Sequence, residues 1–312
     1  MTSHFPSHDE QVPLPQIILD MNYAFARTAI LVASVRLHLF THLANQAQTP
    51  AELAVSAEML PGPTERLLKG LESLGLVARE GERYRLTPVT DYFLVEGKSS
   101  YLGGDTLAMV DYVPAWFELD QILRSSVPYR DLGDATTAEA FFAPRVIDLF
   151  PLIFPLARRI AAELSLREQP EAALQVLDVG AGSAPWSAAF ALQYPTAQVT
   201  ALDLPAVVEQ GRQHIATLAL ANRYRWIEAD METFGFPSLT YDLILCGHVC
   251  RFISDERAKR LLTSLVQSLR PGGTLLVADA FFTEDRSGPP PAITLDLSML
   301  VNSAHGHIRT VS

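Results

Sequence analysis

The stretch VLDVGAGSAPWSAAFAL, at residues 176–192, decides the fold of this chain. An apolar run leads into Gly180 and Gly182, and a helical pattern begins at Pro185. Glycines that directly follow a strand permit a tight turn and let the backbone approach a ligand where a Cβ would collide with it. The stretch therefore predicts a buried strand, a ligand-binding turn and a helix in succession.

Segments of strand and helix character alternate from there toward the C-terminus. Alternation of this kind requires right-handed crossovers and produces a parallel sheet. We therefore predict an α/β domain with a Rossmann-like sheet. Its expected strands are 174–180, 197–204, 223–229, 241–247 and 273–281, and its expected helices are 185–194, 205–221 and 254–270.

Acidic residues at the ends of the predicted strands indicate what the turn binds. Asp203 ends the second strand, 25 residues after Asp178. At this position a carboxylate can accept hydrogen bonds from both hydroxyl groups of a ribose. Asp230 and Met231 follow the third strand. A dinucleotide fingerprint would have a third glycine at Pro185, so the turn fits an amino-acid tail better than a pyrophosphate. A nicotinamide-dependent oxidoreductase is therefore the less favoured interpretation.

The first hundred residues predict a different unit, with the order helix, helix, helix and hairpin of a winged helix-turn-helix. Apolar residues recur at spacings of three and four from Pro15 onward. Thr49 followed by a proline is a helix N-cap signature, and Gly75 is the C-cap expected for a helix over 62–77. Two short strands are expected within 76–87, around a polar turn.

The charge balance limits the partners of the chain. It has 35 acidic and 24 basic side chains, a formal net charge of −11, which disfavours binding of a phosphate backbone by the general surface. Residues 1–100 carry 11 acidic and 8 basic side chains. Because a DNA-reading unit needs a basic face, dimerisation is the favoured role of the winged-helix unit and a DNA-binding regulator is disfavoured. No nucleic acid is expected as a partner.

Cys246 and Cys250 are the only cysteines, too few for a secreted disulfide framework. They alternate with His248, which suggests a metal site, but three ligands on one strand without a fourth elsewhere are more typical of core thiols. The longest apolar stretches are shorter than the about 20 residues that cross a bilayer. We therefore expect a cytoplasmic protein with no metal and no membrane partner.

Taken together, motifs over about residues 15–312 resemble the S-adenosylmethionine-dependent O-methyltransferases of the caffeate and acetylserotonin type, which also include ring C-methyltransferases. The resemblance implies a class I methyltransferase sheet, S-adenosyl-L-methionine as cofactor and a homodimer formed by the N-terminal domain. It implies methyl transfer to a hydroxyl or activated carbon of a small aromatic or polyketide-like molecule of secondary metabolism. The implied domains are a winged-helix dimerisation domain (13–100), a helical, substrate-lining region (101–168) and a cofactor-binding methyltransferase domain (169–312).

The resemblance also implies roles for individual residues. The glycine turn would hold the methionine end of the cofactor, Asp203 the ribose, and Asp230 with Met231 the adenine. The expected cofactor-binding residues are Asp178, Gly180, Gly182, Asp203, Leu204, Asp230 and Met231. The expected substrate-binding residues are Trp116, Met299 and Asn302.

The sequence departs from the family at the catalytic positions. Arg251 stands where the family has a histidine base, and an arginine stays protonated and cannot serve as one. Asp279 fills the place of one flanking carboxylate, whereas Ile308 replaces the other. His248 lies three residues before Arg251, so the expected catalytic residues are His248, Arg251 and Asp279.

Loss of the usual base is compatible with methyl transfer, because alignment of an already activated methyl group supplies much of the acceleration. Arg251 would suit an acidic substrate or stabilise a phenolate. The substitution also leaves open a catalytically impaired, S-adenosylmethionine-binding or ligand-sensing regulator.

The C-terminus is shorter than the resemblance implies. In the family another helix and an antiparallel strand pair follow and pair with the last parallel strand, whereas this sequence ends at Ser312. We therefore expect the strand over 273–281 to be an exposed apolar edge. A fragment of a longer polypeptide is the favoured explanation, and a partner that supplies the missing strands is the alternative.

Overall fold

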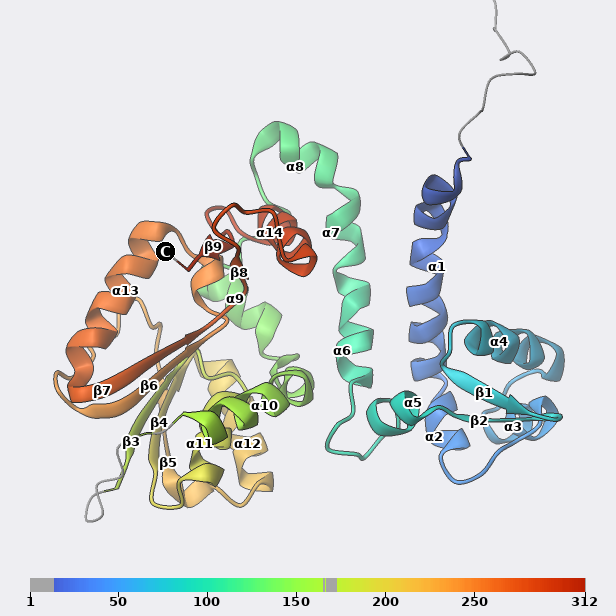
Figure 1. Cartoon of the computed structure of the whole chain (residues 1–312), viewed down its shortest axis with the longest axis horizontal. Helices are drawn as coiled ribbons and strands as arrows, with labels where there is room; N and C mark the ends of the chain where they lie inside the picture. The colour runs from blue at the N-terminus through green and yellow to red at the C-terminus, as the bar shows by residue number, and fades with distance from the viewer. Residues whose placement is uncertain (1–13, 165, 167–172, 312) are drawn as a thin grey trace, which may run out of the picture. The chain divides into compact units, whose positions relative to one another are not determined.

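The computed structural model describes residues 14–164, 166 and 173–311 (Figure 1). Its contacts divide the chain into two compact units, residues 1–107 and 108–312. The aromatic-rich helices that follow residue 108 therefore belong to the same unit as the sheet. The predicted boundary between 168 and 169 lies outside the described residues.

The first unit has the predicted order of helices and hairpin. Thr49 caps the third helix in a capping box with Glu52, and Gly75 follows the fourth helix with a φ of +71°, the left-handed conformation expected of a C-cap glycine. Large side chains such as Phe40, Leu68 and Tyr84 fill the core. The elements are α1 (Gln16–Arg36), α2 (Leu39–Leu43), α3 (Pro50–Ser56), α4 (Pro61–Ser73), β1 (Val77–Glu80), β2 (Arg83–Leu86), α5 (Pro88–Phe93) and α6 (Gly103–Ala108).

Helix α1 exposes large apolar side chains over its N-terminal half. Ile17, Met21, Tyr23 and Phe25 are each more than 60% exposed. Judged by length and composition alone, α1 is long and apolar enough to cross a membrane, although no uninterrupted apolar run within it reaches that length. An exposed apolar surface of this kind is usual where a protein contacts another molecule.

The second unit is built on a parallel sheet with the strand order β5-β4-β3-β6-β7. Its strands are β3 (Gln175–Val179), β4 (Gln198–Asp203), β5 (Tyr224–Glu228), β6 (Tyr241–Gly247) and β7 (Leu269–Ala278). All four neighbouring pairs are parallel, which confirms the predicted Rossmann-like sheet. The last strand begins at Leu269, earlier than predicted, and its register with β6 shifts between the pairs Tyr241–Leu269 and Leu243–Thr274.

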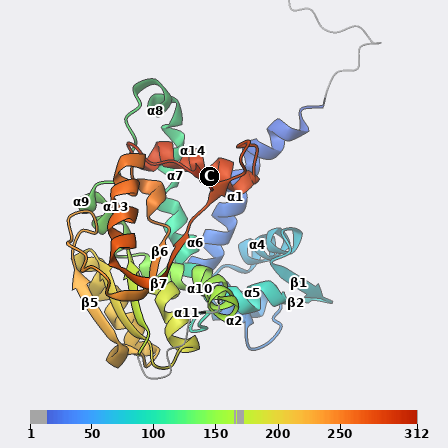
Figure 2. The ribbon, with the colours of Figure 1, turned by 60° about the vertical axis from the view of Figure 1, so that its left-hand side comes forward.

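Helices cover both faces of this sheet (Figures 1 and 2). One face packs against α10 (Val146–Glu163), α11 (Pro185–Gln193) and α12 (Pro205–Thr217), through side chains such as Phe150, Phe190 and Ile215. The other face packs against α13 (Asp255–Ser268), through Leu261 and Leu265. The strands are therefore apolar on both sides, as expected of a buried parallel sheet.

A short turn, η2 (Ala221–Arg223), leads into the amino end of β5. The remaining elements follow the carboxyl ends of the strands or pack near them. They are η1 (Met109–Asp111), α7 (Val113–Phe117), α8 (Leu119–Ser125), α9 (Ala135–Phe142), η3 (Cys250–Phe252), β8 (Phe281–Phe282), α14 (Pro290–Asn302) and β9 (Arg309–Thr310). β8 and β9 form a separate, parallel pair. Among the described residues, no strand pairs with the outer side of β7, which lies at the edge of the sheet as expected.

Candidate functional site

A cavity of about 380 Å³ opens at the carboxyl ends of β3, β4, β5 and β6, and we call it the central cavity. The chain leaves β3 toward β4 on one side, and β6 lies on the other, so the cavity sits where the strand order reverses. Ligands of open α/β sheets bind at such a switch point. Six of the seven predicted cofactor residues line it: Gly180, Gly182, Asp203, Leu204, Asp230 and Met231.

The glycine turn forms one wall of the central cavity. Gly180 has a φ of +65°, and a Cβ built there would lie 2.5 Å from Cγ2 of Val249. The backbone N–H groups of Gly180 and Ala181 both donate to the carbonyl oxygen of Leu202, at 2.9 and 3.1 Å, which fixes the turn to the end of β4. A larger residue at Gly180 would therefore collide with Val249 and displace either the turn or the loop after β6.

Asp178 supports the turn from beneath and does not line the cavity. It is 2% exposed, and its Oδ2 accepts a hydrogen bond from the backbone N–H of Ser187 at the start of α11. Burial raises the pKa of the Asp178 carboxyl to about 6. The structure thus gives Asp178 a role in positioning the strand–turn–helix segment.

Asp203 lies at the carboxyl end of β4, with its carboxylate held by backbone donors. The N–H of Gly182 donates to Oδ2 at 2.7 Å, and the N–H of Leu204 donates to Oδ1 at 2.8 Å. Burial raises the pKa of this carboxyl to about 6, so it is mostly ionised at neutral pH. A carboxylate fixed in this way beside the glycine turn can accept hydrogen bonds from the hydroxyl groups of a bound sugar.

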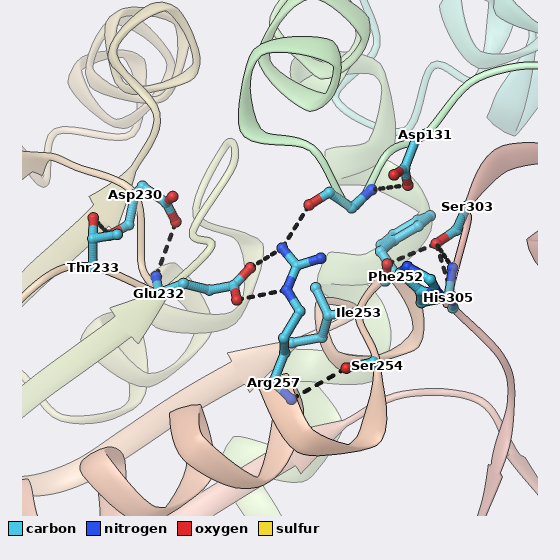
Figure 3. A network of polar contacts seen from close by, with 12 residues as sticks. Asp131, Asp230, Glu232, Thr233, Phe252, Ile253, Ser254, Arg257, Ser303 and His305 are labelled. Atoms are coloured by element: carbon cyan, nitrogen blue, oxygen red, sulfur yellow. Dashed lines mark hydrogen bonds and ion pairs between the residues drawn. The ribbon is translucent and has the colours of Figure 1, made fainter.

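The loop after β5 is held by an ion pair that the sequence analysis missed (Figure 3). Asp230 accepts a hydrogen bond from the N–H of Glu232, at 2.9 Å. The Glu232 carboxylate pairs with Arg257 of α13, whose Nε lies 2.7 Å from Oε2. Arg257 also donates from Nη2 to the carbonyl oxygen of Gly133, at 2.7 Å. One arginine therefore fixes two segments of the cavity lining, around Gly133 and around Asp230.

Arg251 and Asp279 form an ion pair at the position where a base is expected. Nη1 of Arg251 lies 3.1 Å from Oδ1 of Asp279, and the Arg251 N–H donates to Oδ2 at 3.2 Å. The N–H of Ala280 donates to Oδ1 as well, at 2.8 Å. Arg251 lines the central cavity, whereas the Asp279 side chain is 4% exposed and does not.

His248 also lines the central cavity, in a left-handed backbone conformation with a φ of +62°. Its Nδ1 is buried and has no hydrogen-bond partner in the described part of the chain. Burial and the nearby charge of Arg251 lower the pKa of His248 to about 4. At neutral pH this histidine is uncharged and only weakly basic.

Cys246 and Cys250 lie close together behind these residues, and both are buried. Their Sγ atoms are 4.0 Å apart, one at the end of β6 and the other in η3. Within the described ranges, no group of three His, Cys, Asp or Glu side chains is arranged to hold a metal ion.

The three residues expected to bind substrate lie apart from the lining of the central cavity. Trp116 packs against Ala115, Ile122 and Val301, while Met299 and Asn302 are buried on α14. Ile308 is buried against β8 and α14. The apolar wall instead comes from side chains that the sequence analysis did not single out: Leu132, Phe142, Leu149, Leu152, Ile153, Trp186, Val249 and Phe252.

Two family models match the chain. The model of an O-methyltransferase domain covers residues 161–312, and that of an O-methyltransferase dimerisation domain covers residues 19–96. The chain belongs to the O-methyltransferase family. This assignment confirms the resemblance seen in the sequence, and as a member of this family the protein is a methyltransferase with S-adenosylmethionine as its cofactor.

Individual O-methyltransferases resemble the chain over most of its length. It is 27% identical to the 3-hydroxy-5-methyl-1-naphthoate 3-O-methyltransferase of Streptomyces sahachiroi, over 93% of this chain and 84% of the relative. It is 28% identical to the tetracenomycin polyketide synthesis 8-O-methyl transferase TcmO of Streptomyces glaucescens, over 94% and 86%. Human N-acetylserotonin methyltransferase, solved with S-adenosylmethionine, has the same fold, with a TM-score of 0.81, 23% identity and coverage of 98% and 90%.

Proposed function

We propose that this O-methyltransferase family member transfers a methyl group to a small aromatic or polyketide-like acceptor in the central cavity. The curated relatives named above act on a hydroxynaphthoate and in tetracenomycin polyketide synthesis. An apolar wall that includes Phe142, Trp186 and Phe252 suits an acceptor of the same flat, apolar kind.

The cofactor roles follow from where the predicted residues lie. Asp203 would accept hydrogen bonds from the ribose hydroxyl groups. The turn at Gly180 and Gly182 would hold the methionine end of the cofactor, and Asp230 with Met231 would contact its adenine. The cofactor supplies an activated methyl group, and the protein's part is to align it with the acceptor and exclude water. The observation that carries the proposal is the Asp203 carboxylate, fixed by two backbone donors at the edge of the glycine turn.

Calorimetric titration with S-adenosylhomocysteine tests this assignment. We expect binding by the full chain and its loss in Asp203→Ala, because the substitution removes the sugar acceptor. Asp285→Ala, in an exposed turn, is the matched control and should bind as the original protein does. A folded chain that gives neither heat nor a thermal shift with this ligand, but does so with NAD, would contradict the proposal.

We further propose that the first unit forms a homodimer through α1. The match of residues 19–96 to a dimerisation domain includes most of this helix, and its apolar side chains Met21, Tyr23 and Phe25 are exposed within the single chain. Burial of such side chains against a second copy would remove a large apolar surface from water.

A further inference from the structure

The central cavity has a fixed cation, Arg251, beside its apolar wall, but the described residues place no strong base there. The two oxygens of Asp279 already accept three hydrogen bonds, from Arg251 Nη1, Arg251 N–H and Ala280 N–H. The carboxylates that do line the cavity, Asp203, Asp230 and Glu232, lie at the ends of β4 and β5, where the cofactor is proposed to bind. None of them is adjacent in sequence to the loop that carries Arg251.

His248 is too weak a base to ionise an ordinary phenol. Its pKa is lowered to about 4, whereas a phenol such as the tyrosine side chain has a pKa near 10. The equilibrium constant for proton transfer from such a phenol to His248 would therefore be about 10⁻⁶. An acceptor that reaches the cavity as a neutral phenol would therefore keep its proton.

Arg251 has hydrogen-bonding capacity that the protein does not use. Its Nη1 pairs with Asp279, but its Nε is buried and has no partner within the described residues. The guanidinium lies 5.3 Å from the centre of the Phe252 ring, and both side chains line the central cavity. Nε is enclosed by the protein, but the guanidinium lines the cavity and has donors beyond the one Nη1 bond to Asp279, so an oxyanion in the cavity can gain hydrogen bonds from it.

We propose that the methyl acceptor is an oxygen acid that is already ionised in water, an enol or phenol conjugated to a carbonyl group, and that Arg251 binds its oxyanion. This inference rests on the proposed methyltransferase function and names its substrate class. A guanidinium offers such an anion charge-assisted hydrogen bonds, and the Phe252 ring beside it offers a flat apolar surface for the conjugated system.

The charges of the transfer balance without a base. The proton leaves the acceptor in water before binding, so none is released in the cavity. A lone pair of the oxyanion forms the new O–CH₃ bond, while the S–CH₃ bond breaks and its electron pair stays on sulfur. An anion and a sulfonium cation are thereby converted into two neutral molecules, and the Arg251–Asp279 pair keeps its charges throughout.

Binding of a coloured acid tests this inference without measuring activity. The probe is 2-hydroxy-1,4-naphthoquinone, an anion at neutral pH, and its neutral control is 2-methoxy-1,4-naphthoquinone, each titrated into protein saturated with S-adenosylhomocysteine. We expect Arg251→Gln to weaken binding of the hydroxyquinone by about 10- to 100-fold, the effect of losing a hydrogen bond to a charged group. Binding of the methoxyquinone should be unchanged.

The absorbance of the probe gives a second readout. Arg251 stabilises the anion, so the pKa of the bound hydroxyquinone should be lower than that of the free compound by about one to two units. In Arg251→Gln this difference should disappear. Equal affinity for the hydroxyquinone in both proteins, or a bound pKa that does not depend on Arg251, would overturn the inference.

Two further variants serve as controls, one for loss of folding and one for loss of a positive charge. Arg251→Gln leaves Asp279 buried without its partner, so the double variant Arg251→Gln/Asp279→Asn replaces the ion pair by a neutral pair of similar shape. It should keep its fold and lose the preference for the anion. Arg159→Gln removes one exposed positive charge from α10 and should bind both quinones as the original protein does.

Calorimetry with S-adenosylhomocysteine on the same samples separates this inference from the proposed function. If the cofactor analogue binds but Arg251 has no effect on the hydroxyquinone, only the substrate class is wrong. If the cofactor analogue does not bind to folded protein, the proposed function itself fails.

Discussion

At the scale of single residues, two carboxylates at strand ends are held in different ways. Asp279 is paired with the guanidinium of Arg251, while Asp203 accepts only the backbone N–H groups of Gly182 and Leu204. Because burial of Asp203 outweighs these two hydrogen bonds, its pKa is raised to about 6. The residue proposed to bind the ribose therefore titrates just below neutral pH.

The titration of Asp203 predicts a pH dependence of cofactor binding. A bound ribose donates hydrogen bonds that favour the ionised carboxylate, so affinity should rise as the pH increases through about 6. We expect the Kd of S-adenosylhomocysteine to be about tenfold weaker at pH 5 than at pH 7. Asp203→Asn, which cannot ionise, should show weak binding that does not change over this range. A pH-independent Kd in the original protein would contradict the expectation.

At the scale of elements, the glycine turn is fixed from outside by helix α12. A Cβ built on Gly211 would lie 2.3 Å from the carbonyl oxygen of Gly182 and 2.5 Å from the Trp226 ring. The helix thus approaches the turn more closely than any other residue at position 211 would allow. Nothing in the local sequence marks this glycine, because the contact joins parts of the chain that are distant in sequence.

We predict opposite effects for two helical glycines. Gly211→Ala should force α12 away from the turn, destabilise the protein by about 1–3 kcal/mol and weaken binding of S-adenosylhomocysteine. Gly70→Ala is the matched control in α4, where the nearest atom to the new Cβ is 4.0 Å away, and it should stabilise the first unit by up to about 1 kcal/mol. Thermal unfolding and calorimetry measure both effects. Unchanged stability and affinity in Gly211→Ala would show that the turn can shift without cost.

Prediction of these elements from sequence succeeded where the signal is local. Apolar runs and glycines at strand ends predicted the parallel strands, and Thr49 and Gly75 marked helix ends correctly. The ion pair between Glu232 and Arg257 was missed because its partners are 25 residues apart and meet only after α13 packs on the sheet. The apolar lining of the central cavity was missed for a similar reason, since it combines residues from several helices and loops.

At the scale of the whole molecule, the exposed side chains of α1 are the main feature left without a partner in the described single chain. The first unit matches a dimerisation domain, which favours a second copy of the chain as that partner. A dimer would make the stability of the protein depend on its concentration.

Charged substitutions in α1 should therefore change the oligomeric state. We expect Met21→Glu/Phe25→Glu to convert a dimer into a monomer in light scattering, because the new carboxylates would be buried at the interface. Val55→Glu, at an equally exposed apolar position on α3, should leave the dimer intact. A monomeric original protein at micromolar concentration would rule out this role for α1.

The thiols of the chain allow the opening of one of its loops to be measured directly. Cys246 and Cys250 are the only cysteines, and they lie buried on either side of the segment that carries His248. Cys246 is only 1% exposed, so an alkylating reagent can reach it only after local opening, and the rate of its modification measures the free energy of that opening. The protein thus contains its own reporter of loop motion next to the proposed acceptor site, and any molecule that orders the loop can be detected by the protection it gives.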